Sequence, residues 1–376
     1  MNLYFDNAAT SFPKHPAVGE AIAQYLTECG GTYGRSFYGR ALQATTMVER
    51  CRDAIGSILG VEGSKICFTA GATSAINLIL RGLSLDGKRV AVSGMEHNAV
   101  MRPLHHLAEH KGVEIIYLPS RSDGTIDLEA IRRDDLQKAA LIVMIHQSNV
   151  NGVMQPVREV MAIAGSVPVM LDATQSVTAA GLPDFTPNAP RPDFIIFSGH
   201  KALYGPTGVG GAYISHPEWV APLLYGGTGN NSGSYLMPHA YPDRFEAGTL
   251  NIAGICGLLA AINNPLEALH ARNDFLALLE SIAGIDGIEI FRAISFDRQG
   301  ETFSITHKTI PTNVLSEKLF YLYGCETRPG LHCSLLSHHT LKTFPNGTLR
   351  ISLSPYHTTD DLNYLAEAIA KVIKEG

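Results

Sequence analysis

Short runs of apolar, often β-branched residues recur along the first part of the chain and alternate with segments of helical spacing. Seven such runs predict strands, at residues 65–69, 89–93, 114–118, 140–145, 167–171, 193–197 and 211–215. Between them, residues 74–83 and 98–110 repeat apolar side chains with the 3.6-residue period of a helix. This alternation predicts a mainly parallel seven-stranded sheet with helices on both faces. In such sheets, ligands bind beyond the carboxyl ends of the strands.

The pattern changes after residue 253. We expect a long helix over about 265–283, then strands near 288–291, 302–306 and 348–353 with a helix among them. The last helix starts at Thr358 and Asp361, which have capping-box spacing. Its apolar face comprises Leu362, Leu365, Ala366, Ile369, Val372 and Ile373. We therefore predict a smaller C-terminal α/β domain, with the division between domains near residues 250–265.

Composition excludes several classes of protein. The net charge of −6 offers no basic surface for nucleic acid or for an anionic membrane. No run approaches the roughly 18 apolar residues of a membrane helix, and the first residues lack the pattern of a secretory signal peptide. The 6 cysteines show no paired spacing, which is typical of free thiols in a reducing compartment. We expect a cytoplasmic protein that binds neither nucleic acid nor membranes.

The strongest candidate for chemistry is Lys201, which follows the predicted strand 193–197 in the segment SGHK. Most lysines are exposed. Near the end of a buried strand, however, a lysine loses solvation, and its neutral amine can attack a carbonyl group. Ser198 and His200 beside it could bind a phosphate. The glycine-rich stretch that follows matches neither the P-loop pattern nor the dinucleotide fingerprint, so the sequence does not indicate a nucleotide fold.

Polar residues follow several other predicted strands. Asp172 either caps a helix or is a buried carboxylate that needs a cationic partner. A lysine and an aspartate on neighbouring strand ends suit pyridoxal phosphate, which needs an amine for its aldehyde and an acid for its ring nitrogen. Thr73 either caps a helix or helps to bind an anion at a helix N-terminus. His97 and Asn149 follow two further strands, and we expect them at the same edge of the sheet.

Cys333 is the remaining candidate, in a segment rich in basic side chains. Its neighbours there are Arg328, His332, His338 and His339. Positive neighbours favour a reactive thiolate. A metal site is the alternative, but the spacing matches no zinc pattern, and we expect none. His106 and His110 lack the glutamate of a zinc-protease helix, and we expect them on a solvated helix face.

These segments, in this order, resemble the cysteine desulfurases of the class-V aminotransferase group, which are pyridoxal phosphate enzymes of fold type I. The resemblance is to members whose active cysteine lies in an R-x-G-x-x-C stretch. It is carried by YFDNAATSFP, TAGATSAIN, EHNAVMRPL, SNVNG, LDATQS, SGHKALYGPTG, RFEAGTLN, RPGLHC and LRISLSPYHT. It implies a large cofactor-binding domain at residues 15–255 and a small domain made of residues 1–14 and 256–376.

The resemblance also implies roles for individual residues. Lys201 would hold the cofactor covalently and move protons, with Asp172 at the ring nitrogen and Gln175 at the ring hydroxyl oxygen. His97 would lie against the ring face and, as a further catalytic residue, take part in proton transfer. The residues implied at the phosphate are Ala72, Thr73, Ser198 and His200, with Thr249 contributed by the partner of a homodimer. The residues implied around the substrate are Asn149 near the ring, Arg350 at the carboxylate and Arg328 beside the cysteine loop.

The implied reaction converts L-cysteine to L-alanine and leaves the sulfur on Cys333 as a persulfide. A sulfur-acceptor protein and iron–sulfur cluster or thio-cofactor synthesis are the implied partner and use. Three alternatives stay open. They are a selenocysteine lyase, an aminotransferase or β-eliminating lyase that does not use Cys333, and a cofactor-binding protein without turnover.

The chain departs from the group at two places. Relatives often have Thr-Thr-Glu where this chain has Ala72, Thr73 and Ser74, so we expect one fewer phosphate contact and no glutamate pairing with a partner subunit. Leu331 replaces one histidine of the cysteine loop. We expect this second change to affect thiolate activation or the approach of the sulfur acceptor.

Overall fold

The computed structural model describes residues 1–374 except 35, 184, 186–188 and 230–231. Its larger sheet has seven strands in the order β1-β7-β6-β5-β4-β2-β3. The strands are β1 (Ile66–Thr69), β2 (Arg89–Val92), β3 (Glu114–Tyr117), β4 (Leu141–Ile145), β5 (Val169–Asp172), β6 (Phe194–Ser198) and β7 (Gly210–Ile214). Strands β2 to β6 pair in parallel, whereas β7 runs antiparallel to β6 and β1. The predicted mainly parallel sheet is confirmed.

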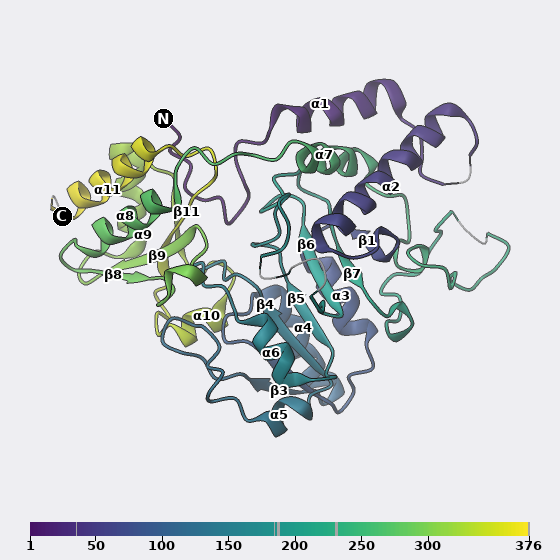
Figure 1. The fold of residues 1–376 in the computed structure, drawn as a ribbon, viewed down its shortest axis with the longest axis horizontal. Helices are drawn as coiled ribbons and strands as arrows, with labels where there is room; N and C mark the ends of the chain where they lie inside the picture. Colours follow the sequence, from purple (N-terminus) through teal and green to yellow (C-terminus); the bar gives the residue numbers. More distant parts are fainter. Residues whose placement is uncertain (35, 184, 186–188, 230–231, 375–376) are drawn as a thin grey trace.

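Two apolar cores lie on opposite faces of this sheet, because successive side chains of a strand point to opposite sides. In β6, Ile195 and Phe197 belong to one core, and Phe194 and Ile196 to the other. The first core is covered by α2 (Gly39–Leu59), α6 (Val157–Ala164) and α7 (Ile252–Asn263). The second is covered by α3 (Ala72–Gly82) and α4 (Asn98–Lys111). Helix α1 (Pro16–Gln24) packs on α7 beside α2 (Figure 1), and a short α5 (Arg133–Gln137) follows β3.

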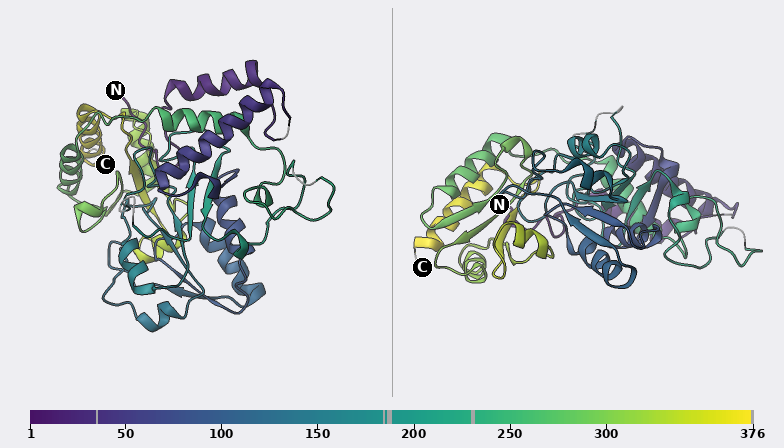
Figure 2. Two further views of the ribbon diagram at one scale, coloured as in Figure 1. Left: turned by 45° about the vertical axis from the view of Figure 1, so that its right-hand side comes forward. Right: turned by 90° about the horizontal axis from the view of Figure 1, so that it is seen from below.

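The C-terminal part forms a second, antiparallel sheet in the order β10-β11-β9-β8. Its strands are β8 (Ile288–Phe291), β9 (Thr302–His307), β10 (Arg328–Gly330) and β11 (Thr348–Ser352). Helices α8 (Arg272–Ala283), α9 (Thr312–Tyr323) and α11 (Thr359–Lys374) share its apolar core and lie on one side of it (Figure 2). A short α10 (Leu335–Thr340) contacts α4. The capping box before α11 is confirmed, since Thr358 N and Asp361 N each donate to the other's side chain.

The long helix expected over 265–283 is wrong in its first part. Helix α8 begins at Arg272, and residues 264–271 are irregular. Apolar spacing suggested a helix there, but Leu269 is exposed, and the buried residue is His270, whose Nδ1 lies 2.9 Å from the His357 carbonyl oxygen. Helices α1 and α2, before residue 60, were not anticipated from the pattern.

The proposed domain limits stay a prediction. Phe5, from the N-terminal segment, packs in the core of the second sheet. Helix α7 packs on α1 and α2, so a division after residue 255 would cut a helix that belongs to the larger unit. Within the described residues, no helix is long and apolar enough to cross a membrane.

A buried ion pair fixes the segment that leads into α7. The guanidinium of Arg52, from α2, donates to both carboxylate oxygens of Glu246, at 2.8 and 2.6 Å. The side chains are 1% and 3% exposed. Glu246 Oε1 also accepts from Phe68 N of β1 at 2.6 Å. Helix α2, strand β1 and residue 246 are thereby held at one point inside the protein.

We predict that Arg52→Met lowers the free energy of unfolding by about 3–5 kcal/mol, because the Glu246 carboxylate would stay buried without its cation. Urea unfolding measures the loss. Adding Glu246→Gln should recover part of it, since no uncompensated charge then remains. The control is Lys308→Met, which removes the exposed pair of Lys308 with Asp286 and should change nothing measurable. Equal effects of Arg52→Met and Lys308→Met would contradict the prediction.

Candidate active site

The carboxyl ends of β2, β4, β5 and β6 meet at one edge of the large sheet because these strands run parallel. β1 points the same way, since it is antiparallel to β7, which is antiparallel to β6. The loops after these strands surround a cavity of about 250 Å³. The sequence-predicted residues that line it are Ala72, Thr73, His97, Asn149, Asp172, Gln175, Ser198, His200 and Lys201.

Lys201 and Asp172 provide the charged groups of the cavity. Burial lowers the pKa of the Lys201 amine below its ordinary value, and Asp172 acts in the opposite direction. Asp172 is buried, and its Oδ1 accepts from Thr174 N at 3.0 Å. That contact closes a turn over residues 174–176, and among the described residues no helix begins there, so the helix-cap alternative for Asp172 is wrong and the buried carboxylate remains. The lysine amine therefore loses its proton more easily than an exposed lysine does, and it lies within electrostatic range of a carboxylate.

His97 stands at the start of α4 with a fixed orientation. Its Nδ1 accepts from Ala99 N at 2.9 Å, so the proton of the neutral ring lies on Nε2. Burial, and then the neighbouring Lys201, lower the pKa of His97 to about 4. The ring is therefore uncharged at neutral pH. On another wall, Gln175 Nε2 donates to the Ala8 carbonyl oxygen at 2.8 Å, which fixes that side chain as well.

One end of the cavity suits an anion. Ala72 and Thr73 form the first turn of α3, whose backbone N–H groups have no partners further along the helix. Ser198 and His200 face this turn from the end of β6, and β7 passes close by at Gly210. A Cβ at Gly210 would lie 2.8 Å from Gly71 Cα, so only glycine permits this approach. Together with Lys201 and Asp172, these features fit a planar aldehyde cofactor with a phosphate, as pyridoxal phosphate is.

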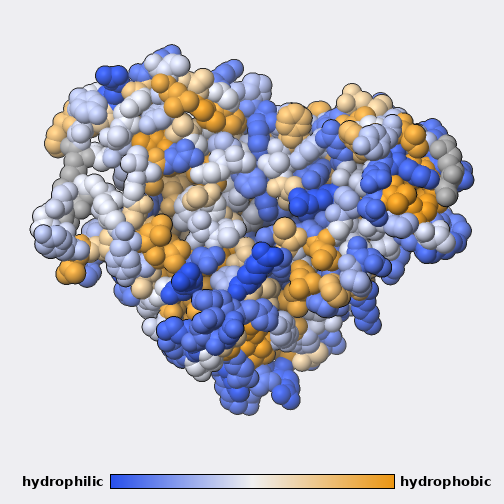
Figure 3. All heavy atoms as spheres, turned by 180° about the vertical axis from the view of Figure 1, so that it is seen from behind, coloured by the Kyte–Doolittle hydropathy of each residue, from blue (hydrophilic) through white to orange (hydrophobic). Residues whose placement is uncertain are grey.

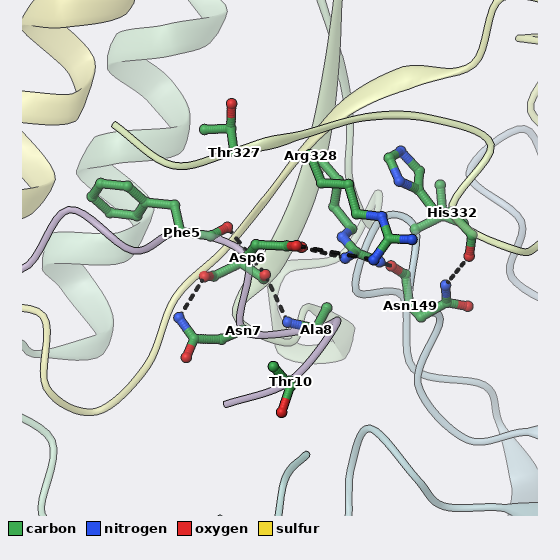
Figure 4. Close-up of polar contacts among 12 residues, drawn as sticks. Phe5, Asp6, Asn7, Ala8, Thr10, Asn149, Thr327, Arg328 and His332 are labelled. Atoms are coloured by element: carbon green, nitrogen blue, oxygen red, sulfur yellow. Dashed lines mark hydrogen bonds and ion pairs between the residues drawn. The ribbon is translucent and has the colours of Figure 1, made fainter. Parts of the chain in front are cut away.

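Cys333 projects from a loop with unusual backbone geometry. His332 and Cys333 both have left-handed backbone conformations, with φ of 48° and 56°. Such strain persists only where surrounding contacts enforce it. Asn149 Nδ2 donates to the His332 carbonyl oxygen at 2.8 Å (Figure 4). Ser334 Oγ donates to Asn149 Oδ1 at 2.9 Å. Asn98 N donates to the Cys333 carbonyl oxygen at 2.8 Å.

Cys333 differs from the other cysteines in its exposure to solvent. Cys333 is exposed, whereas Cys29, Cys51, Cys67, Cys256 and Cys325 are buried. Cys333 lines a second hollow of about 470 Å³, whose wall shares Thr73, His97 and Ala99 with the first cavity. The cysteine therefore lies at the mouth of the cavity that holds Lys201.

Arg350, on β11, is a buried cation beside the same loop. Its Nη2 lies 2.5 Å from Asp6 Oδ1, and its Nη1 donates to the Asn149 carbonyl oxygen at 3.0 Å. Its Nε is buried and has no partner among the described residues. Arg328 approaches the other oxygen of Asp6 at 4.0 Å (Figure 4). The motif YFDNAATSFP contains Asp6, but Asp6 was not predicted as a site residue. Nothing in the local sequence shows that Asp6 pairs with two distant arginines.

Several predicted features lie outside the cavity, and Arg328 and Arg350 are not among the residues that line it. Thr249 is exposed and does not line it, so any role there requires a second chain. Among the described residues, no three His, Cys, Asp or Glu side chains are placed to hold a metal. His332 Nε2 instead lies 3.1 Å from the Thr348 carbonyl oxygen. His106 and His110 are exposed and lie against each other with tilted rings whose centroids are 4.2 Å apart.

Glu96 is a buried acid directly behind the site that the sequence did not reveal. Its Oε1 accepts from Ser93 Oγ and from Ile145 N, the latter at 2.6 Å, while its Oε2 has no partner among the described residues. Ile145 pairs with Asp172 across β4 and β5. Burial raises the pKa of Glu96 from 4.5 to about 8. The carboxyl is therefore mostly protonated at neutral pH.

Comparison with known proteins gives consistent matches over the whole chain. Residues 3–365 match the family described as aminotransferase class-V. A probable cysteine desulfurase of Methanothermobacter thermautotrophicus is 29% identical over 100% of this chain and 96% of its own length. One of Xylella fastidiosa is 31% identical over 99% of this chain and 91% of its own length. The apo structure of a cysteine desulfurase from Thermococcus onnurineus superposes with a TM-score of 0.90 at 25% identity, covering 100% of this chain and 95% of the other.

The Glu96 carboxyl predicts a pH dependence of stability. Between pH 4.5 and about 8 the folded protein keeps a proton that the unfolded chain loses, so the free energy of unfolding falls as pH rises through this window. Glu96→Gln keeps a neutral group of the same shape and should remove that fall. Urea unfolding from pH 5 to pH 8 should show that the free energy of unfolding of Glu96→Gln rises relative to that of the parent. The control Glu367→Gln, at an exposed position, should show no such rise. Parallel pH profiles for Glu96→Gln and the parent would exclude a protonated Glu96.

Proposed function

The chain belongs to the class-V aminotransferases, and within them to the cysteine desulfurases, and we propose that it converts L-cysteine to L-alanine with transfer of the sulfur to Cys333. The family and the fold type expected from the sequence motifs are thereby confirmed. The roles of individual residues stay proposals. The observation that carries them is the shared wall between the Lys201 cavity and the Cys333 hollow.

The residues present fit pyridoxal phosphate. Lys201 would hold it through Nζ, Asp172 would face its ring nitrogen, Gln175 its ring oxygen and His97 its ring face. Thr73 and its backbone neighbour Ala72 would hold the phosphate with Ser198 and His200. When bound, the cofactor accepts the electrons that the substrate α-carbon releases on losing its proton.

The protein's own groups then divide the work. Arg350 offers its free Nε to the substrate carboxylate, with Arg328 on the open side. Lys201 Nζ, whose pKa is lowered by burial, takes and returns the proton at the α-carbon. Asn149 positions both Arg350 and the cysteine loop. Its carbonyl oxygen accepts a hydrogen bond from Arg350, and its side chain donates one to the backbone of the loop.

Cys333 performs the sulfur transfer. A bond forms between its Sγ, as thiolate, and the substrate sulfur, while the carbon–sulfur bond breaks. The electron pair of the broken bond remains with the carbon fragment, which takes up a proton and leaves as alanine. The protein keeps a persulfide on Cys333. The exposure of the Cys333 side chain supports this role.

A homodimer remains part of the proposal. Residues 223–229 and 232–240 lie in a loop that extends away from the body of the protein (Figure 1) and include several exposed apolar side chains. These are Leu224, Tyr225, Tyr235 and Leu236. The view from behind shows apolar groups broken up by hydrophilic residues (Figure 3). Exposed apolar side chains near Thr249 support an interface that brings Thr249 to the partner's phosphate site.

Selenocysteine is an alternative substrate for the same groups, since its carbon–selenium bond breaks more readily. A cytoplasmic location stays a prediction from the composition, and a sulfur-acceptor protein and a use in iron–sulfur cluster assembly stay predictions from the resemblance.

We predict that the purified protein is yellow and that Lys201→Ala loses this absorbance and slows alanine release about 10²–10⁴-fold. Cys333→Ala should keep the colour and lose the persulfide. Mass spectrometry after incubation with L-cysteine or L-selenocysteine locates the added sulfur or selenium, with the five buried cysteines as internal controls. Alanine release by Cys333→Ala at the parent rate would rule out the persulfide role.

Asp6 should tune the affinity for the substrate. Asp6→Asn keeps an acceptor for Arg350 Nη2 but removes the compensating charge, so the KM for L-cysteine should fall about fivefold, the effect of roughly 1 kcal/mol. Asp6→Ala removes the anchor as well, and its KM should rise. Steady-state alanine formation measures both variants. An unchanged KM in both would show that Asp6 does not act on Arg350.

A further inference from the structure

The hollow beside Cys333 has a basic wall that the proposed reaction does not use. It lies between α3 and α4, and Arg81, Arg102 and His106 line it together with Cys333. Among the described residues, none of the side chains that line it is acidic. The net charge of the whole protein is −6, so this positive surface beside the reactive thiol contrasts with the rest of the molecule.

The two arginines are available for a ligand. Both are exposed, Arg81 in the last turn of α3 and Arg102 in the second turn of α4. Within the described part of the chain, neither forms an ion pair or a side-chain hydrogen bond, whereas Arg89, Arg132 and Arg298 each bind a carboxylate at 2.8 Å. Arg102 lies near enough to contribute to the lowered pKa of His97, so its charge reaches the mouth of the cavity.

We propose that this hollow binds the anionic groups of a small thiol that accepts the sulfur from Cys333. The inference rests on the proposed desulfurase function. A volume of about 470 Å³ lies in the range of small-molecule sites and admits a thiol of tripeptide size or less. The arginine forks match carboxylate groups, and Cys333 lies on the same wall.

The transfer needs no further reactant. The thiolate of the acceptor attacks the outer sulfur of the Cys333 persulfide, and the bond between that sulfur and Sγ breaks. The electron pair of this bond leaves with Sγ, which becomes the Cys333 thiolate again. The acceptor departs as a persulfide, and neither oxidant nor reductant is consumed.

The test measures the two half-reactions separately. First, the holoenzyme is loaded with L-cysteine, and the persulfide on Cys333 is quantified by mass spectrometry. Then the loaded protein is mixed with mercaptosuccinate, thioglycerol or cysteamine, which are anionic, neutral and cationic thiols, and loss of the persulfide is followed. Rates for each thiol are compared between variants, so that differences in intrinsic thiol reactivity cancel.

The variant is Arg81→Gln with Arg102→Gln. It should load normally, but discharge by mercaptosuccinate should slow about tenfold, while discharge by thioglycerol stays the same. Added salt should weaken the effect. Arg81→Glu with Arg102→Glu should shift the preference towards cysteamine. Lys371→Gln, an exposed charge on α11, is the matched control and should behave as the parent.

The outcomes separate the two proposals. If no persulfide forms on the parent protein, the proposed function fails. If it forms but the arginine variants discharge to all three thiols at parental rates, the anion site is wrong. A persulfide that resists all three thiols also overturns the inference, and would point to a protein acceptor.

Discussion

The burial of the Lys201 amine beside the Asp172 carboxylate is the interaction on which the rest of the site depends. Burial lowers the pKa of this amine and so favours its neutral form, whereas the neighbouring carboxylate acts in the opposite direction. Both groups lie at strand ends, where the parallel arrangement of β5 and β6 brings them together. The large sheet therefore positions these reactive polar groups just beyond the carboxyl ends of its strands.

Asn149 connects this edge to the second sheet. Its side chain holds the backbone of the cysteine loop, and its carbonyl oxygen accepts from Arg350 on β11. The N-terminal segment closes the arrangement, because Asp6 binds Arg350 and the Ala8 carbonyl oxygen accepts from Gln175. Residues separated by more than 300 positions thus act as one polar network, and the two sheets meet at the site.

Local pattern was sufficient for much of the fold. The ends of β5 and β6 were predicted to within two residues, because buried parallel strands are short, nearly continuous apolar runs. The helix expected over 265–283 failed at its start, since Leu269 has helical spacing but finds no core. Lys201, Asp172 and Cys333 were found because each carries unusual chemistry for its position. Asp6, Glu96 and the Arg52–Glu246 pair were missed, because their partners are distant in sequence and no local pattern announces a long-range contact.

In the proposed reaction, the left-handed backbone at His332 and Cys333 affects how sulfur would leave the protein. A cysteine on a long, flexible loop could carry its sulfur outwards to a distant acceptor. Here Asn149 and Asn98 donate hydrogen bonds to the carbonyl oxygens of His332 and Cys333. The backbone on both sides of the thiol is thereby fixed, so the thiol moves only by rotation of its own side chain. In the proposed transfer, the acceptor would therefore have to approach Cys333 to within bonding distance.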